Sequence, residues 1–150
     1  MIEAATDSDL LAALHAQSFE KPWTADSIGR LLQNPAAFAL IWRDEASSDV
    51  LGFVLAWAVA AESEILTLAV TPEARRKGVG SGLVSAAGAA ALLRGSGSML
   101  LEVDEKNAAA RAMYAKLGFE QAGRRGGYYA GAGGETDAIV MRRALPRPVI

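Results

Sequence analysis

The segment LAVTPEARRKGVGSGLV, residues Leu68 to Val84, carries the strongest structural signal in the chain. It begins at the end of one apolar run, passes through Thr71-Pro72 and three basic residues, and opens a second apolar run with three alternating glycines. A proline stops a strand, and glycines ahead of a helix let its unbonded N–H groups approach an anion closely. The segment therefore predicts a strand, an anion-binding loop and a helix in succession.

The glycine loop matches neither of two common nucleotide motifs. It lacks the P-loop pattern GxxxxGK followed by serine or threonine, and Leu83 stands where the dinucleotide pattern GxGxxG needs its last glycine. The layout favours a pyrophosphate as ligand, with electrostatic attraction added by Arg75, Arg76 and Lys77. Alternatively, the glycines only let the helix pack closely on a sheet, and the loop alone does not decide between these interpretations.

Upstream of the loop, the pattern predicts two helices and three strands. The first helix is expected to start at a Thr6 cap, with Asp9 three residues on. The second is expected to start at a Thr24 cap and to end at Asn34-Pro35. The predicted strands are Phe38–Arg43, Val50–Ala60 and Glu62–Val70. Strict alternation in the last of these strands would place four side chains on the same face of the sheet: Glu64, Leu66, Leu68 and Val70.

Downstream, helices and strands alternate. The predicted elements are a helix at Gly80–Leu93, a strand at Met99–Val103, a helix from Asn107 to a Gly118 terminator, and strands at Phe119–Gly123 and Asp137–Arg143. The segment GGYYAGAGGE between the last two strands is expected to be a flexible loop. Strand, helix and strand between Glu62 and Val103 predict a right-handed parallel crossover. We expect one mixed α/β (α+β) domain over residues 1–145 and a flexible tail over 146–150.

Composition excludes several classes of site. The 150 residues are 51% hydrophobic and 21% charged, which is enough apolar material for one core. The net charge of -2 argues against nucleic acid as a partner. There is no cysteine for a disulfide, a thiolate metal site or a thiol nucleophile, and one histidine, His15, cannot build a zinc site alone.

The sequence also predicts where the chain works. Its N-terminus lacks the positive start and apolar segment of a signal peptide. The longest apolar run, LGFVLAWAVAA, is too short to span a bilayer. A cytoplasmic domain that binds neither metal nor membrane is therefore expected, and the sequence leaves the oligomeric state open.

Two motifs identify a family resemblance. The pattern R/Q-x-x-G-x-G/A fits the glycine loop at Arg75, Gly78 and Gly80, and N-x-x-A-x-x-x-Y-x-x-x-G-F fits a later segment at Asn107, Ala110, Tyr114, Gly118 and Phe119. The chain thus resembles the GNAT superfamily of acyl-CoA-dependent N-acyltransferases from Phe19 to Met141. The segments PWT, EILTLAV, LEV, NAAARAMY and the closing YY-loop-DAIVM resemble the ribosomal-protein-alanine N-acetyltransferase (RimI) family within it.

The resemblance implies a fold and a cofactor. It implies a mostly antiparallel central sheet in which one parallel strand pair splays apart into a V that holds acetyl-CoA. The backbone that would pair with the pantetheine arm belongs to Leu68, Ala69 and Val70. The residues that would surround the pyrophosphate, chiefly through backbone N–H groups, are Arg75, Arg76, Lys77, Gly78, Val79, Gly80 and Ser81. The Asn107 side chain would contact the cofactor near its reactive end.

Glu102 is the leading candidate for the general base. It lies in the apolar strand MLLEV, opposite the face that carries Met99, Leu101 and Val103. A carboxylate there faces a polar cleft or costs stability, and partial burial suits it to accept a proton near neutral pH. The resemblance points to the same residue. Pattern alone favours a structural glutamate paired with Lys106 or an arginine, and the alternative bases are Glu62 and Glu64.

Tyr114 is the leading candidate for the general acid, because the resemblance places there the tyrosine that protonates the departing CoA thiolate. A tyrosine with pKa near ~10 can donate to a thiolate whose thiol has pKa near ~8.5. The alternative is a core tyrosine packed beside Met113 and Leu117.

Three aromatic residues are candidates for the acceptor site. The resemblance places Trp23 on one side of the incoming peptide, and Tyr128 and Tyr129 on the other; packing of these loops on the core is the alternative. Charged groups of the substrate would meet Asp137 or Glu135, whereas His15 is expected to be a surface or packing residue.

The expected acceptor is the N-terminal α-amino group of a ribosomal protein that begins with alanine, modified by direct transfer. A lysine side chain, a polyamine or a small-molecule amine is the alternative acceptor. A non-catalytic acyl-CoA-binding regulator is the alternative class of protein.

Overall fold

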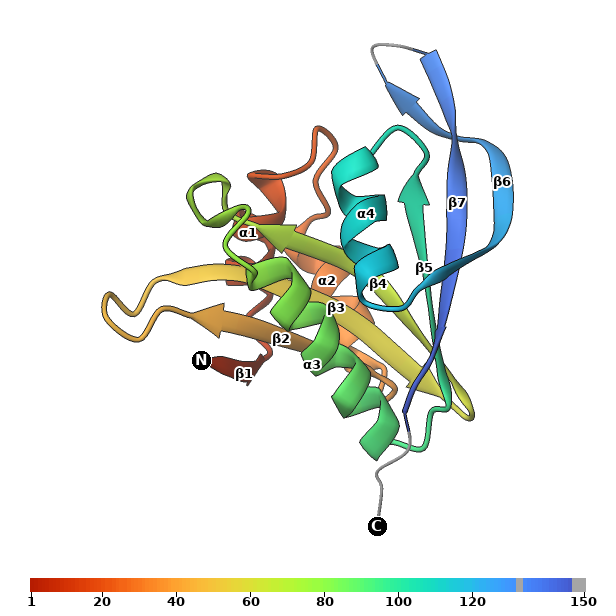
Figure 1. Ribbon diagram of the computed structural model, residues 1–150. Coiled ribbons are helices and arrows are strands. Elements are labelled where there is room, and N and C mark those ends of the chain that lie inside the picture. Colours follow the sequence, from red (N-terminus) through yellow and green to blue (C-terminus); the bar gives the residue numbers. More distant parts are fainter. Residues whose placement is uncertain (132–133, 147–150) are drawn as a thin grey trace.

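A seven-stranded sheet forms the centre of the computed structural model, with α3 and α4 on one face and α1 and α2 on the other (Figure 1). The structure describes residues 1–131 and 134–146, with the side chains of all of these except 128–131 and 134–135. Of the expected tail at 146–150, residues 147–150 lie outside this range. The strand order is β1-β2-β3-β4-β5-β7-β6.

The elements follow the predicted order. The helices are α1 (Ser8–Ala16), α2 (Ala25–Gln33), α3 (Val79–Leu93) and α4 (Ala108–Lys116), with a 3-10 turn η1 (Pro72–Ala74). The strands are β1 (Ile2–Ala5), β2 (Ala37–Arg43), β3 (Val50–Val59), β4 (Glu62–Val70), β5 (Ser98–Asp104), β6 (Glu120–Gly131) and β7 (Gly134–Ala144).

Two apolar clusters hold the helices to the sheet. The first lies under α3 and α4, and its fully buried members include Val54, Leu83 and Met99. The second lies under α1 and α2 and is built around Leu11 and Phe53. Burial on both faces makes the middle strands of the sheet the rigid frame for any site at their ends.

The sheet has one parallel pair, and it is short. β4 and β5 pair only over Glu62–Glu64 and Ser98–Leu100, after which the two strands diverge. All the other neighbours among the described strands are antiparallel. This confirms the predicted mixed, mostly antiparallel sheet with a splayed parallel pair, and α3 is the crossover between the two strands.

A bulge in β4 contradicts the strict alternation predicted for this strand. The pairing with β3 shifts between Leu55 and Ala56, so that Leu66 has no direct partner. Ile65 therefore shares the first cluster with Leu68 and Val70, and Leu66 packs in the second. The extra residue moves the side chains beyond it to the opposite face.

Two local predictions were wrong, and one strand was not predicted. The cap of α1 is Asp7, whose carboxylate accepts the N–H of Leu10, and not Thr6. The strand β1 was not expected; it is a four-residue edge strand that pairs with β2. The segment from Gly126 to Glu135 was expected to be a loop, but β6 and β7 pair again from Tyr129↔Thr136 to Gly131↔Gly134. A bulge between Arg125 and Tyr129 accommodates the extra residues of β6, so that pairing with β7 resumes at Tyr129.

Gly52 is a position where the fold has no room for a side chain. A Cβ there would lie 2.7 Å from the carbonyl oxygen of Ala69 and 3.2 Å from the Cα of Val70. Since both are backbone atoms of β4, Gly52→Ala should lower the free energy of unfolding by about 1–3 kcal/mol in urea denaturation. The control is Gly97→Ala, whose Cβ would meet only the Ala61 carbonyl at 3.9 Å. Equal stability of the two variants would contradict the prediction.

Candidate active site

The edge of β4 that faces the splay offers unpaired backbone groups. The N–H of Thr71 donates to the carbonyl of Leu51 on β3 at 2.8 Å. Because backbone polar groups alternate in direction along an antiparallel strand, those of Leu68 and Val70 point away from β3, toward β5. Within the described residues, the pairing with β5 has already ended at Glu64. Leu68 and Val70 therefore present bonding groups to the V, whereas Ala69 directs its own toward β3.

Arg75 closes one end of this edge. The carbonyl of Val70 accepts bonds from Arg75 Nε and from the Ser18 hydroxyl, both at 3.3 Å, and Arg75 Nη2 also donates to Ser18 Oγ at 3.2 Å. The guanidinium thus ties the end of β4 to the segment after α1. This leaves the Val70 N–H and both polar groups of Leu68 as the open edge.

The glycine loop delivers the N-terminus of α3 next to this edge. Gly78 is the N-cap and has φ of 82°, a left-handed conformation, and no side chain caps the helix. The N–H of Gly82 makes the first bond of the helix, to the Gly78 carbonyl at 3.0 Å. The N–H groups of the preceding first-turn residues have no partner within the helix. These donors and the helix dipole make this end of α3 suitable for a phosphate group.

Gly80 lies where α3, α4 and β4 meet. A Cβ at this position would lie 3.3 Å from Met113 Sδ on α4, 3.7 Å from a Val70 methyl and 3.8 Å from a Leu68 methyl. The missing side chain therefore faces the space between the two helices and the open strand edge. An elongated ligand with an anionic end, such as acetyl-CoA, fits this arrangement: the strand edge can pair with its amides and the helix end with its phosphates.

Two glutamates lie on the other face of the splayed strands. Met99, Leu101 and Val103 point into the first cluster, so Glu102 points toward the side of α1 and α2. Glu102 is 22% exposed and forms an ion pair with Arg125 of β6, at 2.8 Å. Of the two partners proposed from sequence, Lys106 or an arginine, the structure shows an arginine, which lies on β6.

Glu64 is electrostatically linked to the same place. Burial raises the pKa of Glu64, a hydrogen bond from the Trp57 side chain lowers it in part, and the negative charge of Glu102 raises it further. Glu62, the other alternative base, is exposed at the start of β4. The structure therefore brings together Glu64 and Glu102, and the positive charge of Arg125, which is paired with Glu102, lowers the pKa of Glu64 in part.

Tyr114 approaches β5 from the opposite face. It is 7% exposed in the first cluster, and its ring meets the edge of Phe119 at a centroid distance of 5.8 Å. It has the burial expected of a core tyrosine and also lies on the side of β5 where α3 and the glycine loop are found. Asn107 caps α4, since its Oδ1 accepts the N–H of Ala110 at 3.1 Å. Its carbonyl group is thus engaged in the helix.

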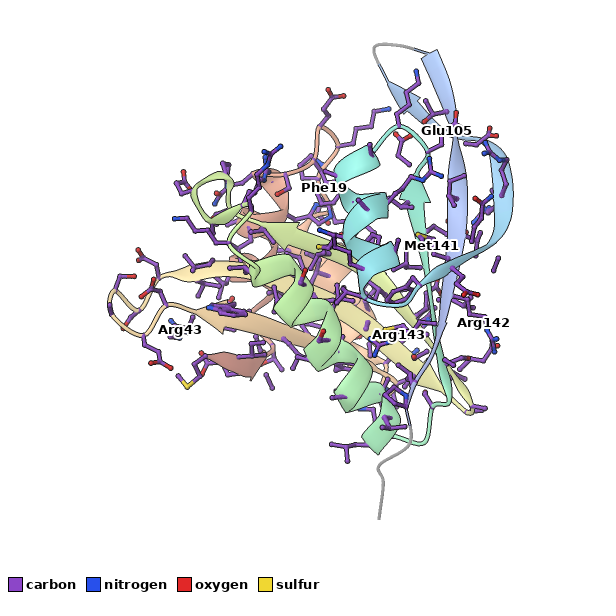
Figure 2. All side chains as sticks on the ribbon, in the orientation of Figure 1. Phe19, Arg43, Glu105, Met141, Arg142 and Arg143 are labelled. Carbon is purple, nitrogen blue, oxygen red and sulfur yellow. The ribbon has the colours of Figure 1, made fainter. Side chains whose placement is uncertain are left out.

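The expected acceptor residues are only partly described. Trp23 is half-buried on the segment between α1 and α2, and Figure 2 marks Phe19 on the same segment. Tyr128 and Tyr129 belong to β6, but their side chains lie outside the described part of the structure, as does the side chain of Glu135. Any contact of these side chains with an acceptor remains a prediction.

Asp137 has a structural partner in the bulge of β6. One carboxylate oxygen accepts the N–H of Gly127 at 2.9 Å, and the other binds Arg124 at 2.7 Å. These two hydrogen bonds hold the pKa of Asp137 below its usual range, with Arg124 the larger cause. Arg124 also binds Glu105, at the end of β5 (Figure 2). Asp137 thus fixes the backbone next to Tyr128.

Sequence reasoning missed the partners that hold these residues. Arg124 and Arg125 carry no motif, and their carboxylate partners lie 13 to 23 positions away. His15 was expected to be a surface or packing residue; it is 1% exposed and accepts the backbone N–H of Trp23. The only sequence signal for it is a lone histidine at an apolar helical position.

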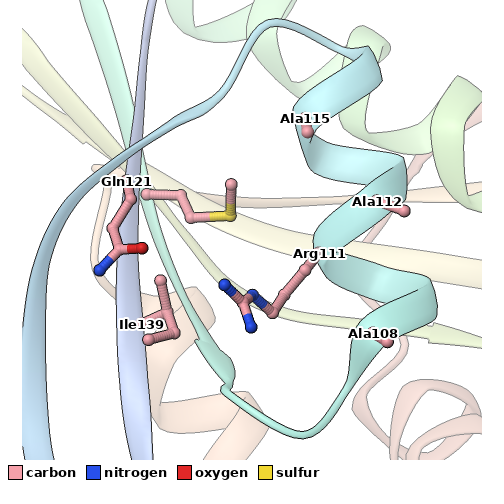
Figure 3. A pocket seen from close by; sticks show the side chains of 7 residues that line it. Ala108, Arg111, Ala112, Ala115, Gln121 and Ile139 are labelled. Atoms are coloured by element: carbon pink, nitrogen blue, oxygen red, sulfur yellow. The ribbon is translucent and has the colours of Figure 1, made fainter.

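Two cavities lie outside the V. One of about 300 Å³ is formed between α4 and the β6–β7 hairpin, with Arg111 of α4 pointing toward Gln121 and Ile139 across it (Figure 3). The other, about 450 Å³, lies along α2 beside Trp23 and is lined by Ser27, Arg30, Leu31 and Asn34.

Neither a metal cluster nor a membrane helix is found in the part of the chain that the structure describes. Within residues 1–131 and 134–146, His, Asp and Glu form no group of three that could hold a metal ion. In the same residues, no helix is long and apolar enough to cross a membrane.

Known proteins share both sequence and fold with this chain. The family model described as the acetyltransferase (GNAT) family matches residues 8–119. The ribosomal protein bS18-alanine N-acetyltransferase of Escherichia coli K12 is 31% identical over 147 residues, 97% of this chain and 96% of its own length. The protein of that name from Salmonella typhimurium is 38% identical over 101 residues, 67% of each chain.

A solved structure agrees with these matches. The crystal structure of the Escherichia coli ribosomal-protein-S18-alanine N-acetyltransferase superposes with a TM-score of 0.87 and 27% identity, over 99% of this chain and 96% of that one. The predicted family resemblance is thus confirmed by motif, by sequence over nearly the whole length and by fold: the chain belongs to the acetyltransferase (GNAT) family.

Proposed function

We propose that this acetyltransferase moves an acetyl group from acetyl-CoA directly to the N-terminal α-amino group of a ribosomal protein that begins with alanine. The observation that carries the proposal is the V between β4 and β5, which has on one face the N-terminus of α3, uncapped by any side chain, and on the other the Glu64–Glu102 pair. The relatives named as bS18-alanine N-acetyltransferases support the acceptor. A ribosomal acceptor would place the reaction in the cytoplasm.

The cofactor side of the proposal assigns backbone groups to acetyl-CoA. The N–H groups from Arg76 to Ser81 would hold the pyrophosphate, and Leu68 and the Val70 N–H would pair with the pantetheine arm. Arg75 would act by fixing the end of β4, in line with its bonds to Val70 and Ser18. While the Asn107 oxygen caps α4, its amide N–H groups would be the donors that contact the cofactor.

The acceptor side needs a negative charge and a proton acceptor. Glu64 and Glu102 would attract the ammonium form of a peptide N-terminus, and Glu102 would take its proton, directly or through water. An α-amino group has a pKa near ~7.7–8.0, so its deprotonation is a mild task compared with that of lysine at ~10.4. This difference favours a peptide N-terminus as acceptor.

Acetyl-CoA supplies an activated acetyl thioester whose leaving group is the CoA thiolate. Tyr114 would give that thiolate its proton from the α3 and α4 side of the sheet. Glu102 acts from the opposite face, so the acid and the base can act at one point only where β4 and β5 separate. The chain contains no cysteine, which is consistent with direct transfer and no acetyl-enzyme thioester.

Mass spectrometry of three peptides tests the acceptor. Two share one alanine-initiated sequence with an internal lysine, one with a free and one with a blocked N-terminus; the third starts with a bulky residue. We expect one acetyl group on the free alanine terminus only, located by fragmentation. Modification of the lysine alone would support the side-chain alternative. Acetyl-CoA binding with no acetylated peptide or amine would indicate the regulator class.

A further inference from the structure

His15 is a buried titratable group that no step of the proposed reaction uses. It lies in the last turn of α1 and is 1% exposed. The polar part of a buried imidazole needs a partner, or its burial costs free energy. Its partner therefore indicates what the side chain is for.

The ring holds the segment after α1 by a hydrogen bond and by stacking. The Trp23 backbone N–H donates to His15 Nδ1 at 3.1 Å. The imidazole stacks on Phe19 at 4.0 Å and on Trp23 at 5.1 Å, and meets Phe53 of β3 at 6.4 Å. One side chain thus contacts both aromatic residues of the segment 17–23 and joins them to the core of the sheet. We call the segment 17–23 the aromatic loop.

The hydrogen bond fixes the charge state of the ring. A nitrogen that accepts an N–H carries no proton, so the proton of the neutral imidazole belongs to Nε2. Nε2 is buried and has no hydrogen-bond partner among the described groups. Burial lowers the pKa of His15. The ring is therefore held neutral at physiological pH.

We propose that neutral His15 is the positioning residue that holds the aromatic loop in the conformation that receives the acceptor peptide, and that protonation releases the loop. This rests on the proposed function and on the family resemblance, which implies that Trp23 lies beside the incoming peptide. Protonated His15 would present an N–H to the Trp23 N–H, so the bond would be lost and a charge buried without a partner. Release of the loop would change the protein surface, because Phe19 is 41% exposed and Trp23 lines the cavity along α2.

No described charge opposes this behaviour. The ring contacts come from the aromatic loop and from β3, and all of them are aromatic. The loop's own charged side chains, Glu20 and Lys21, are exposed, and on α2 Asp26 pairs with Arg30 in solvent. Arg75, beside the end of β4, is bound to Ser18 and Val70. Because burial lowers the pKa of His15 below its ordinary value of 6.5, the ring in the folded protein is still neutral at pH 6.5 and takes up a proton only as the pH falls through that lowered pKa.

Two variants separate positioning from packing. His15→Phe keeps a stacking ring but removes the acceptor of the Trp23 N–H, whereas His15→Asn offers Oδ1 close to the place of Nδ1 and does not titrate. We expect His15→Phe to raise KM for the alanine-initiated peptide by about tenfold while KM for acetyl-CoA stays unchanged. His15→Asn should recover most of the peptide KM. An equal rise of both KM values in His15→Phe, or no recovery in His15→Asn, would overturn the proposal.

The pH dependence gives a second readout. The ratio of kcat/KM of the wild type to that of His15→Asn cancels the titration of the acceptor amine and of other groups. We expect the ratio to be flat above about pH 6.5 and to fall in more acidic solution, as His15 takes up a proton. A ratio that stays flat throughout would overturn release by protonation.

A measurement without substrate keeps this proposal distinct from the proposed function. Hydrogen exchange followed by NMR should show the Trp23 amide protected in the wild type and in His15→Asn, and exchanging freely in His15→Phe. If His15→Phe does not fold, the wild type still carries the test. Its Trp23 amide should lose protection in acid while amides of α2 keep theirs. If the Trp23 amide loses protection in acid but no peptide is acetylated, the proposed acceptor is wrong and the role of His15 in holding the loop stands. If the Trp23 amide exchanges freely in the wild type, His15 does not hold the loop.

Discussion

Glu102→Gln is expected to slow turnover by about 10²–10⁴-fold and to leave the affinity for acetyl-CoA unchanged. The amide keeps the size of the side chain but does not take a proton. Glu102 lies on the face of β5 opposite the helices α3 and α4, so it makes no part of the proposed cofactor site. The neighbouring carboxylate of Glu64 then remains, but its ionisation is already disfavoured by burial.

Tyr114→Phe should slow turnover to a similar extent, because it removes the proposed proton donor and retains the ring packed against Phe119. Steady-state kinetics with an alanine-initiated peptide would measure both effects, and calorimetric titration would measure acetyl-CoA binding. The stability of each variant should be followed by thermal unfolding, since Tyr114 is buried.

Glu105→Gln is the matched control for Glu102→Gln. Glu105 is also paired with an arginine of β6, in its case Arg124, and lies three positions along the same segment. If Glu102 were only one half of an ion pair, the two variants would lose the same small amount of activity. A loss confined to Glu102→Gln supports the base, and unchanged rates in both Glu102→Gln and Tyr114→Phe would remove the acid–base assignment.

The segment from Leu68 to Val84 was predictable because its structure is set by local chemistry. Pro72 ends β4 and opens the 3-10 turn, and Gly78 adopts the left-handed conformation at the start of α3. Each effect depends on the residue and its immediate neighbours. The family motifs added the prediction of a splayed parallel strand pair, and the structure confirms it in β4 and β5.

The features that sequence reasoning missed depend on partners far along the chain. β1 is four residues long and pairs with β2, 34 to 40 positions away in the sequence, so its own pattern carries little signal. The bulge at Leu66 follows from the register between β3 and β4. β6 continues past Gly126 because Asp137 accepts the Gly127 N–H on the neighbouring strand.

The candidate site also combines features that local motifs predict with features that depend on distant partners. The backbone donors of the glycine loop and the positions of Glu102 and Tyr114 followed from motifs. Their electrostatic surroundings did not, because Arg125 lies on β6, which is separated from the strand of Glu102 by β7, and only the strand order of the sheet brings the two side chains together. The hydrogen bond from Trp23 to His15 was not predicted, because one apolar-face histidine looks the same in sequence whether or not a backbone N–H lies over its ring nitrogen.

Gly80→Trp is expected to weaken acetyl-CoA binding by about 10²-fold or more, which corresponds to roughly 3 kcal/mol. The indole would start between Met113, Val70 and Leu68, and would fill the space where α3, α4 and the open edge of β4 meet. Gly80→Ala should bind nearly normally, since its Cβ would press only on the flexible end of Met113 at 3.3 Å. Calorimetric titration of the folded variants measures the difference.

Ser85→Trp provides the matched control for that substitution. Ser85 is exposed on the same helix, a little more than one turn further on, so an indole there adds equal bulk outside the V. It should bind acetyl-CoA as the wild type does. Normal affinity in a folded Gly80→Trp variant would mean that the cofactor does not run between α3, α4 and β4. The glycines would then serve only to let α3 pack on the sheet, a role seen at Gly82, where a Cβ would collide with the Trp42 ring. Weak binding in Gly80→Trp alone would assign the space beside Gly80 to the cofactor.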